Sequence, residues 1–317
     1  MDVIFASGVL YHMTDPVRHL FDISRSCRRA YLVICSAVPK LKEEKIGAMS
    51  GPSKAIGNVL DRYITSAPSH QNALDIFEGQ WTSLLPGSGQ GLTAGSIPLF
   101  EDPRAAWAIE KLGGVQDKTV LELGPLEGGH SYMLQSAGAM SVLAVESNTN
   151  AFLRCLIVKE ILDLKNVRFL HGDFRAFLVS DEQQFDVIFA SGVLYHMTEP
   201  VQLLRDISRR CRSAYLWTHY HDSALIEQNQ AISNRFGPAQ HLEYDGLKYE
   251  LHAYSYDVDL GLNWAGFCGG STPSCAWLTR QSILDALAHF GFKNVDIAFE
   301  VPDHPHGPCF AIVASQD

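Results

Sequence analysis

The stretch TVLELGPLEGGHSYMLQSAGAMSVLAVE, residues 119–146, decides the fold. It opens with an apolar, β-rich run at 119–124 and passes through a glycine-bearing turn. A helical pattern then runs to Ala137, and a second β-rich run follows at 141–146. A strand, a helix and a strand at this spacing predict a parallel pair joined by a crossover helix.

The same alternation continues toward the C-terminus. A short helix at 105–112 leads into this region, and a last helix is expected at 279–290. Five further β-rich runs lie at 167–171, 185–190, 214–218, 294–300 and 308–314. The sequence therefore predicts an α/β fold with a doubly wound, mostly parallel seven-stranded sheet.

Polar residues follow four of the predicted strands. Gly124, Glu146, Asp173 and Ser191 each lie where an apolar run ends. Glu146 comes 22 residues after Gly124 (146 − 124 = 22), a spacing at which an acid can hold a ribose diol. Ligands of open parallel sheets bind beyond the carboxyl ends of the strands. The four residues together predict a nucleotide site at this edge.

Residues 119–221 resemble the class I S-adenosylmethionine-dependent methyltransferases, and residues 56–317 do so more loosely. The segment ELGPLEGG at 122–129 is similar to the acidic-x-Gly-x-Gly-x-Gly loop of that family. It departs from the pattern because the middle glycine is Leu126 and the last is Gly128. The run VLYHMTEP is similar to the Leu-His-His or Leu-Tyr-His runs that follow the fourth strand in the family.

The resemblance implies S-adenosyl-L-methionine as the cofactor, and it assigns roles by match to the motifs. The implied cofactor-binding residues are Glu122 near the methionine amino group, Gly124 and Gly128 in the loop, Glu146 on the ribose, Asp173 on the adenine amine with Phe174 beside the base, and Ser191 and Gly192 near the methionine moiety.

Three residues are candidates for catalysis: His196, Tyr195 and His219. His196 is the first choice if a base is needed, because an unperturbed imidazole has a pKa of about 6.5. A hydrogen-bonding role that shapes the pocket is an equal alternative for this histidine. The fifth strand runs into His219, His221 and Asp222, but the sequence places no further ligand beside them, so no metal is expected. His219 is instead a second candidate base or part of the pocket lining.

An internal duplication opens the chain. Residues 2–32 recur at 186–216 with a constant offset of 184 (186 − 2 = 184), and 25 of the 31 aligned residues are identical. The first copy lacks the glycine loop and the ribose acid, so it should not bind the cofactor. A structural or vestigial role is favoured for it.

The expected organisation has three parts. Residues 1–35 form a partial duplicate of the strand-helix-strand unit at 185–219, and 36–103 form a linker with an N-terminal helical and loop region. The methyltransferase domain then covers 104–317. An insert at 223–278, between the fifth strand and the last helix, is expected to form a lid that sets acceptor specificity and includes Trp264 and Trp277.

The composition of the chain disfavours some classes of binding partner. The 317 residues carry a formal net charge of −10, which disfavours a protein that binds nucleic acid through phosphates. No apolar run is long enough to span a membrane, and seven scattered cysteines without a Cys-x-x-Cys pair are typical of reduced thiols in a cytoplasm. The sequence is compatible with a homodimer.

The expected activity is methyl transfer to a small-molecule or glycan-type acceptor, with a hydroxyl as the favoured acceptor group. Three alternatives stay open. A tRNA-modifying methyltransferase is one, since some wobble-uridine modifiers carry a similar Leu-Tyr-His run. A nicotinamide-dependent oxidoreductase is the second, although GPLEGG fits Gly-x-Gly-x-x-Gly poorly. A non-catalytic cofactor-binding or scaffold protein is the third.

Overall fold

The computed structural model describes residues 3–7, 18, 29–33, 63–86, 91–180, 182–255, 270 and 272–316. Contacts divide the chain into two units, Met1–Tyr63 and Ile64–Asp317, which are described separately.

The first unit contains a parallel strand pair, β1 (Val3–Ser7) and β2 (Arg29–Val33). Val3 lies opposite Arg29, and adding the repeat offset of 184 to both numbers gives the pair Val187 and Ser213. Those two residues are also opposite each other, in the second copy. The duplicated sequence therefore pairs its strands in the same register in both places.

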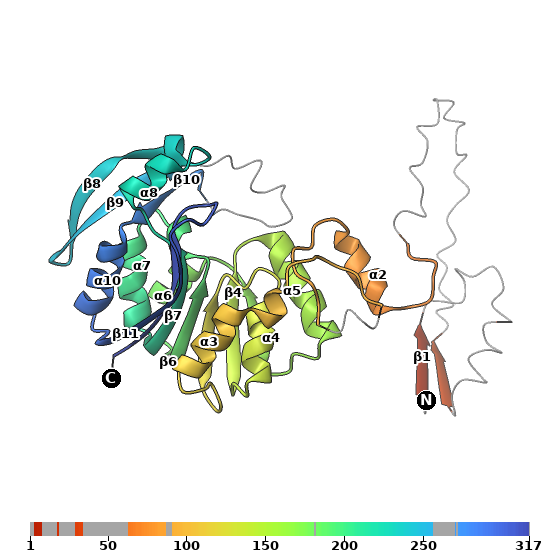
Figure 1. Cartoon of the computed structure of the whole chain (residues 1–317). Helices are drawn as coiled ribbons and strands as arrows, with labels where there is room; N and C mark the ends of the chain where they lie inside the picture. Colours follow the sequence, from red (N-terminus) through yellow and green to blue (C-terminus); the bar gives the residue numbers. More distant parts are fainter. Residues whose placement is uncertain are drawn as a thin grey trace, which may run out of the picture. The chain divides into compact units, whose positions relative to one another are not determined.

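A seven-stranded sheet forms the centre of the second unit (Figure 1). Its order is β11-β12-β7-β6-β3-β4-β5; β3 to β7 run parallel to one another, while β12 runs antiparallel to both β7 and β11. The strands are β3 (Thr119–Leu123), β4 (Ser141–Glu146), β5 (Val167–His171), β6 (Phe185–Ser191), β7 (Cys211–His219), β11 (Asn294–Val301) and β12 (Cys309–Ser315). The predicted α/β sheet is confirmed, within a few residues at each strand.

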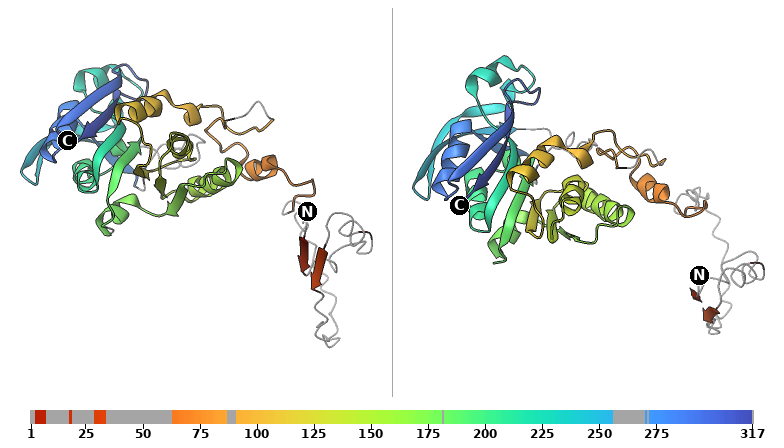
Figure 2. Two further views of the ribbon diagram at one scale, coloured as in Figure 1. Left: turned by 90° about the horizontal axis from the view of Figure 1, so that it is seen from below. Right: turned by 60° about the horizontal axis from the view of Figure 1, so that its bottom comes forward.

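Helices cover both faces of this sheet (Figures 1 and 2). The helices are α2 (His70–Leu74), α3 (Pro103–Lys111), α4 (Gly129–Ser136), α5 (Thr149–Ile161), α6 (Phe174–Ser180), α7 (Pro200–Ser208), α8 (Ser223–Gln228) and α10 (Arg280–His289). The sequence of α7 shows why a helix forms there: Pro200 opens its first turn, and Val201, Leu204 and Ile207 recur every three residues and bury one face.

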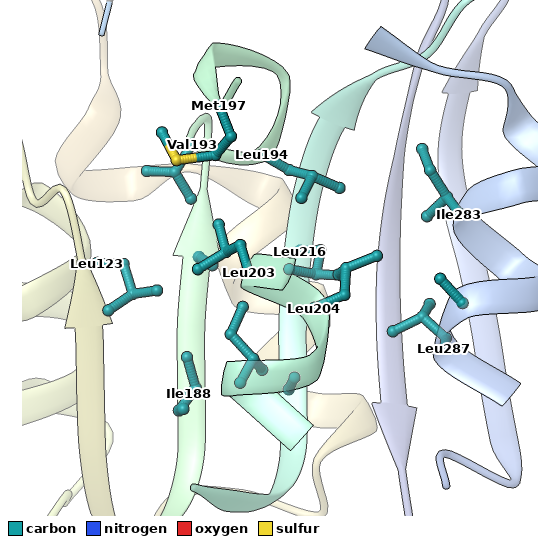
Figure 3. Packing of buried hydrophobic residues seen from close by; sticks show 14 of the residues in the cluster. Leu123, Ile188, Val193, Leu194, Met197, Leu203, Leu204, Leu216, Ile283 and Leu287 are labelled. Atoms are coloured by element: carbon teal, nitrogen blue, oxygen red, sulfur yellow. The ribbon is translucent and has the colours of Figure 1, made fainter. Parts of the chain in front are cut away.

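The core has two apolar clusters that share the sheet. One packs residues of α6, α7 and α10 against the sheet, and Figure 3 shows Leu204 of α7 and Leu287 of α10 beside Leu216 of β7. The other joins residues of α2 to α5 with the sheet. Leu74, Phe77, Trp81 and Phe100 belong to it, so residues before 104 contribute side chains to the core of the sheet.

A second, antiparallel sheet interrupts the chain after β7. It has the order β10-β9-β8, with β8 (Phe236–Tyr244), β9 (Leu247–Ser255) and β10 (Ser274–Leu278). Asp245 and Gly246 connect β8 to β9 with φ of 54° and 80°, the two positive values that a tight hairpin turn requires. Strands β8 and β9 are thus the two arms of one hairpin.

Two further observations concern the helices and the cysteines. No described helix is both long and apolar enough to cross a membrane. Cys155, Cys211, Cys275 and Cys309, the cysteines among the described residues, are buried free thiols.

Candidate functional site

A pocket of about 250 Å³ lies at the carboxyl ends of β3, β4, β5 and β6. Most of the residues predicted from the sequence line it, and these are Gly124, Glu146, Asp173, Phe174, Ser191, Gly192, Tyr195 and His196. Glu122, Gly128 and His219 do not line it. The sheet therefore brings together residues that are up to 72 positions apart in the chain (196 − 124 = 72).

The loop after β3 has a backbone suited to close contact with a ligand. Gly124 has φ of 66°, and a Cβ on it would lie 2.9 Å from Val193 Cγ1, so only glycine fits. Leu126, where the family pattern has a glycine, also has a positive φ of 56°. The departure at Leu126 therefore keeps the glycine-like backbone and places an apolar side chain against the pocket.

Glu146 ends β4 and is only 6% exposed. Its Oε1 accepts a hydrogen bond from Asn148 N at 2.8 Å, and its Oε2 accepts one from Leu126 N at 3.2 Å. Burial raises the pKa of this carboxyl, and these backbone N–H groups oppose the rise. Glu146 thus fixes the glycine loop against the next strand and faces the pocket.

Glu122 lies one layer behind the pocket. It is 2% exposed, accepts a hydrogen bond from Ser131 Oγ, and has His130 Nδ1 4.0 Å from its Oε1. Burial raises the pKa of Glu122, against the opposing effects of His130 and Ser131. His130 lines the pocket, whereas Glu122 does not and lies behind that imidazole.

The acid after β5 is held by a neighbour. Asp173 pairs with Arg175, whose Nη2 lies 2.7 Å from Oδ2. The hydrogen bond from Arg175 lowers the pKa of Asp173 despite its partial burial. Asp173, Phe174 and Arg175 all line the pocket, so a charged pair and an aromatic ring lie side by side there.

Tyr195 and His196 lie on a 3₁₀ turn, Leu194–His196, directly after β6. Their rings are tilted against each other with centroids 4.1 Å apart. Burial lowers the pKa of His196 to about 3, and the nearby His219 adds to the shift. The imidazole is therefore neutral at physiological pH, where it can accept a hydrogen bond but is a weak base.

His219 ends β7 behind the ring of Tyr195, with centroids 4.7 Å apart. Its Nδ1 lies 2.7 Å from Gly307 O, and burial lowers the pKa of the ring to about 4. His221 does not join it, because that ring stacks on His252 at a centroid distance of 3.4 Å. Asp222 caps α8 by accepting from Leu225 N.

Sequence reasoning missed a cationic group in the pocket. Arg104 lines it at the start of α3, with its guanidinium 4.4 Å from the ring centroid of Trp217. Asp102, which is 2% exposed, binds Arg104 through Nε and Nη2 and accepts a third contact from His130 Nε2 at 3.0 Å. The Asp-Pro-Arg run at 102–104 marks a helix start, but nothing in it indicates where the side chains point.

Glu127 anchors the preceding segment to the glycine loop. It is 1% exposed, accepts from Thr82 N at 3.0 Å and from Ser83 N at 2.8 Å, and pairs with Arg154 at 3.1 Å. Glu127 is therefore a buried anchor of the loop and not a solvated surface residue. Ser83 thereby becomes part of the pocket lining.

Residues 115–249 match a family described as "Methyltransferase domain". The N-terminal domain of EvdMO1, solved in the presence of SAH and D-fucose, has a similar fold, with a TM-score of 0.57 and 23% identity over 78% of this chain and 99% of that one. The family match and the sheet order agree with the pocket at the carboxyl edge. The chain contains a methyltransferase domain with the fold of the class I S-adenosylmethionine-dependent methyltransferases.

Curated relatives of this methyltransferase include two tRNA U34 carboxymethyltransferases. The protein of Saccharophagus degradans is 20% identical over 70% of this chain and 72% of its own length. That of Actinobacillus succinogenes is 29% identical over 56% of this chain and 57% of its own length. Several further matches to this group span only about a third of each protein.

The family assignment confirms S-adenosyl-L-methionine as the cofactor of this methyltransferase and sets the nicotinamide alternative aside. The role of each site residue stays a prediction. Of the expected lid, Trp264 lies outside the described residues, and Trp277 is 3% exposed in a cluster with Ile226 and Ile232 rather than in the pocket lining. Gly270 and Thr272 are the insert residues that reach the pocket.

Proposed function

We propose that this methyltransferase transfers the methyl group to a hydroxyl of a small polar, sugar-like acceptor. The main support for this proposal is the set of residues that line the pocket beyond the cofactor loop. There the lining combines the rings of Tyr195 and Trp217 with the polar groups of His196 and Arg104. Aromatic rings pack on the apolar faces of a sugar while nearby polar groups bind its hydroxyls.

The residues present fit the cofactor. The glycine loop exposes its backbone, and Glu146 at the tip of β4 offers carboxylate oxygens to a ribose diol. Ser83 belongs to the pocket lining, and its buried Oγ has no hydrogen-bond partner in the described part of the chain. When bound, the cofactor supplies a sulfonium that carries the reactive methyl group.

The protein residues would then align and desolvate the acceptor. Neutral His196 accepts a hydrogen bond from the acceptor hydroxyl and holds its oxygen toward the methyl group. With a pKa of about 3, His196 is too weak a base to remove the hydroxyl proton before transfer, so its role is to orient the hydroxyl. We therefore expect His196→Gln, which keeps a neutral acceptor, to retain more activity than His196→Ala. Equal losses in both variants would contradict this role.

The net charge of the chain and one structural neighbour support this acceptor class. The formal net charge of −10 disfavours a large polyanion as the substrate. The structurally similar domain of EvdMO1 was solved with D-fucose. A tRNA acceptor is the second candidate, favoured by the names of the curated relatives.

Calorimetric titration of SAH, followed by an acceptor screen, tests the proposal. We expect binding near −8 kcal/mol, a micromolar Kd, which Glu146→Ala weakens and the exposed control Glu160→Ala does not. SAH release is then measured with free and nucleotide-linked hexoses and deoxyhexoses, and with bulk tRNA. Turnover on tRNA alone would replace the sugar-like acceptor, and SAH binding unaffected by Glu146→Ala would remove the ribose role of that residue.

A further inference from the structure

A histidine and a cysteine face each other across two strands beside the pocket. His219 of β7 lies directly opposite Cys309 of β12 in the antiparallel ladder. Side chains of directly opposed residues project from the same face of a sheet, with Cβ atoms about 5 Å apart. Both residues are buried, at 5% and 2% exposure.

A third side chain reaches them from the turn between β11 and β12. The turn carries His304, and one ligand-type atom from each of His219, His304 and Cys309 lies within 4.8 Å of the other two. His304 is partly exposed, whereas the other two are enclosed. The cluster is therefore open to solvent on the side of the turn.

The same turn also orients His219. Gly307 has φ of 103°, and its carbonyl oxygen lies 2.7 Å from His219 Nδ1. A second contact, from Asn229 Nδ2 to Pro305 O at 2.9 Å, fixes the turn from outside. A backbone carbonyl on one ring nitrogen sets the tautomer and leaves Nε2 free, which is the usual support of a histidine that binds a metal.

We propose that His219, His304 and Cys309 bind a Zn²⁺ ion, with water in the fourth position. Two imidazoles and a thiolate are ligands that zinc prefers, and three protein ligands with one open position are a common zinc geometry. Ligand atoms of a tetrahedral zinc lie about 3.5 Å apart. The three ligand atoms lie within 4.8 Å of one another, so each pair has to close by at most about 1.3 Å to reach that spacing (4.8 − 3.5 = 1.3).

Binding changes one hydrogen bond of the turn. His304 Nδ1 accepts from His306 N at 3.2 Å, so Nε2 carries the proton in this arrangement. Coordination through Nε2 needs the other tautomer, and the contact with His306 is then lost. Coordination also releases the thiol proton of Cys309.

The ion would join three segments that are otherwise connected only by loops and by the hydrogen bonds between β7 and β12. It would link β7, β12 and the turn at 302–308, directly behind the Tyr195 ring that lines the pocket. The expected role is structural, so this inference does not rest on the proposed acceptor. The alternative is a packed cluster without a metal, in which His219 simply stacks on Trp277 at 5.0 Å.

Titration with Co²⁺ distinguishes the two. The full, untagged chain is first dialysed against a chelator and then titrated with Co²⁺ and, in competition, with Zn²⁺. We expect one equivalent of Co²⁺ to produce a thiolate-to-cobalt charge-transfer band, Zn²⁺ to remove it, and Zn²⁺ to raise the Tm. No such band in the folded chain would overturn the proposal.

Variants show whether these residues are the ligands. Cys309→Ser should abolish the charge-transfer band, and His304→Ala should weaken Co²⁺ binding by more than about 100-fold, the largest loss usual for a mere outer-shell partner. His304 lies on the turn, so its substitution leaves the fold intact even if Cys309→Ser does not fold. His306→Ala, two residues away and exposed, is the control and should bind as the natural chain does. An unchanged band in folded Cys309→Ser, or unchanged affinity in His304→Ala, would refute the assignment.

Discussion

Glu122, a buried acid behind the pocket, makes the stability of the fold depend on pH. Burial raises its pKa, and a raised carboxyl pKa in the folded state favours folding at low pH. That contribution is complete below the unfolded pKa of about 4.5 and disappears as pH rises through the folded pKa. At neutral pH the buried charge therefore opposes folding.

Glu122→Gln should thus be more stable than the natural chain at pH 8. The gain in the free energy of unfolding should shrink as pH falls toward 5, because the natural carboxyl takes up a proton there while the amide does not titrate. The Ser131 hydroxyl can still donate to the amide oxygen. Urea unfolding of both proteins at several pH values measures the difference, and a gain that grows toward low pH would contradict the argument.

Asp102 and Arg104 form a pair that the sequence did not indicate. Burial alone would raise the pKa of Asp102, but the hydrogen bonds and charges of His130 and Arg104 hold that pKa well below its usual range. The stabilisation is present above the unfolded pKa of about 3.8 and is complete at pH 7.

Asp102→Asn should destabilise the protein by roughly 2–3 kcal/mol at pH 7, below the usual cost of breaking a fully buried pair because the Arg104 side chain is 24% exposed. Asn caps helices as well as Asp does, so the loss reports the charge and not the cap of α3. Unfolding of Asp102→Asn, Arg104→Met and the double variant measures the coupling. A coupling energy near zero would show that the pair contributes nothing.

The sequence predicted site residues well where a strand placed them. Glu146, Asp173 and Ser191 follow strands directly, so the parallel sheet alone brings them to one edge. Arg104 and His130 reach the pocket through helix packing, which no local pattern encodes. His219 was predicted from its strand end, yet its side chain lies behind Tyr195 and outside the lining.

At the scale of elements, the insert after β7 has its own core. Trp277 of β10 stacks on His219 and on Tyr254, and its Nε1 is buried without a hydrogen-bond partner among the described residues. An unsatisfied buried donor costs free energy, so its removal offsets part of the lost packing.

Trp277→Phe should therefore cost no more than about 1 kcal/mol of unfolding free energy, whereas Trp277→Ala should cost about 3–5 kcal/mol. SAH affinity should be unchanged in Trp277→Phe, because Trp277 is absent from the pocket lining. Thermal unfolding and SAH titration provide the two numbers. A large loss of SAH affinity in Trp277→Phe would contradict its place outside the pocket lining, whereas the predicted lid role is tested by acceptor affinity, which should fall in this variant if Trp277 helps to set acceptor specificity.

Strand positions were more predictable than the shape of the insert. Several runs of the central sheet, such as VLAV in β4 and VIFA in β6, are continuous apolar segments, which are typical of buried parallel strands. The sequence of β8 mixes polar and apolar residues, because this strand is mostly exposed and none of its residues is fully buried. Its pairing with β9 depends on the Asp245–Gly246 turn, a short signal within an irregular stretch.

At the scale of the whole molecule, the pocket belongs to one unit. Its lining runs from Ser83 to Thr272, and the second unit begins at Ile64.

A chain that lacks residues 1–50 should consequently bind SAH within about twofold of the full chain. Its Tm should stay within about 3 °C, which corresponds to about 1 kcal/mol at this size. Calorimetry on both chains measures the affinity and the Tm together. Insoluble protein, or a tenfold loss of SAH affinity, would show that the duplicated segment supports the fold or the site.

The position of β12 has a consequence for the order of folding. This strand lies inside the sheet, between β7 and β11, although it begins 90 positions after β7 ends (309 − 219 = 90). Pairing across so long a stretch of chain is slow, because the loop must close before the contacts form. Until the insert, α10 and β11 have been synthesised, one side of β7 therefore remains an open edge that the growing chain must keep from pairing elsewhere.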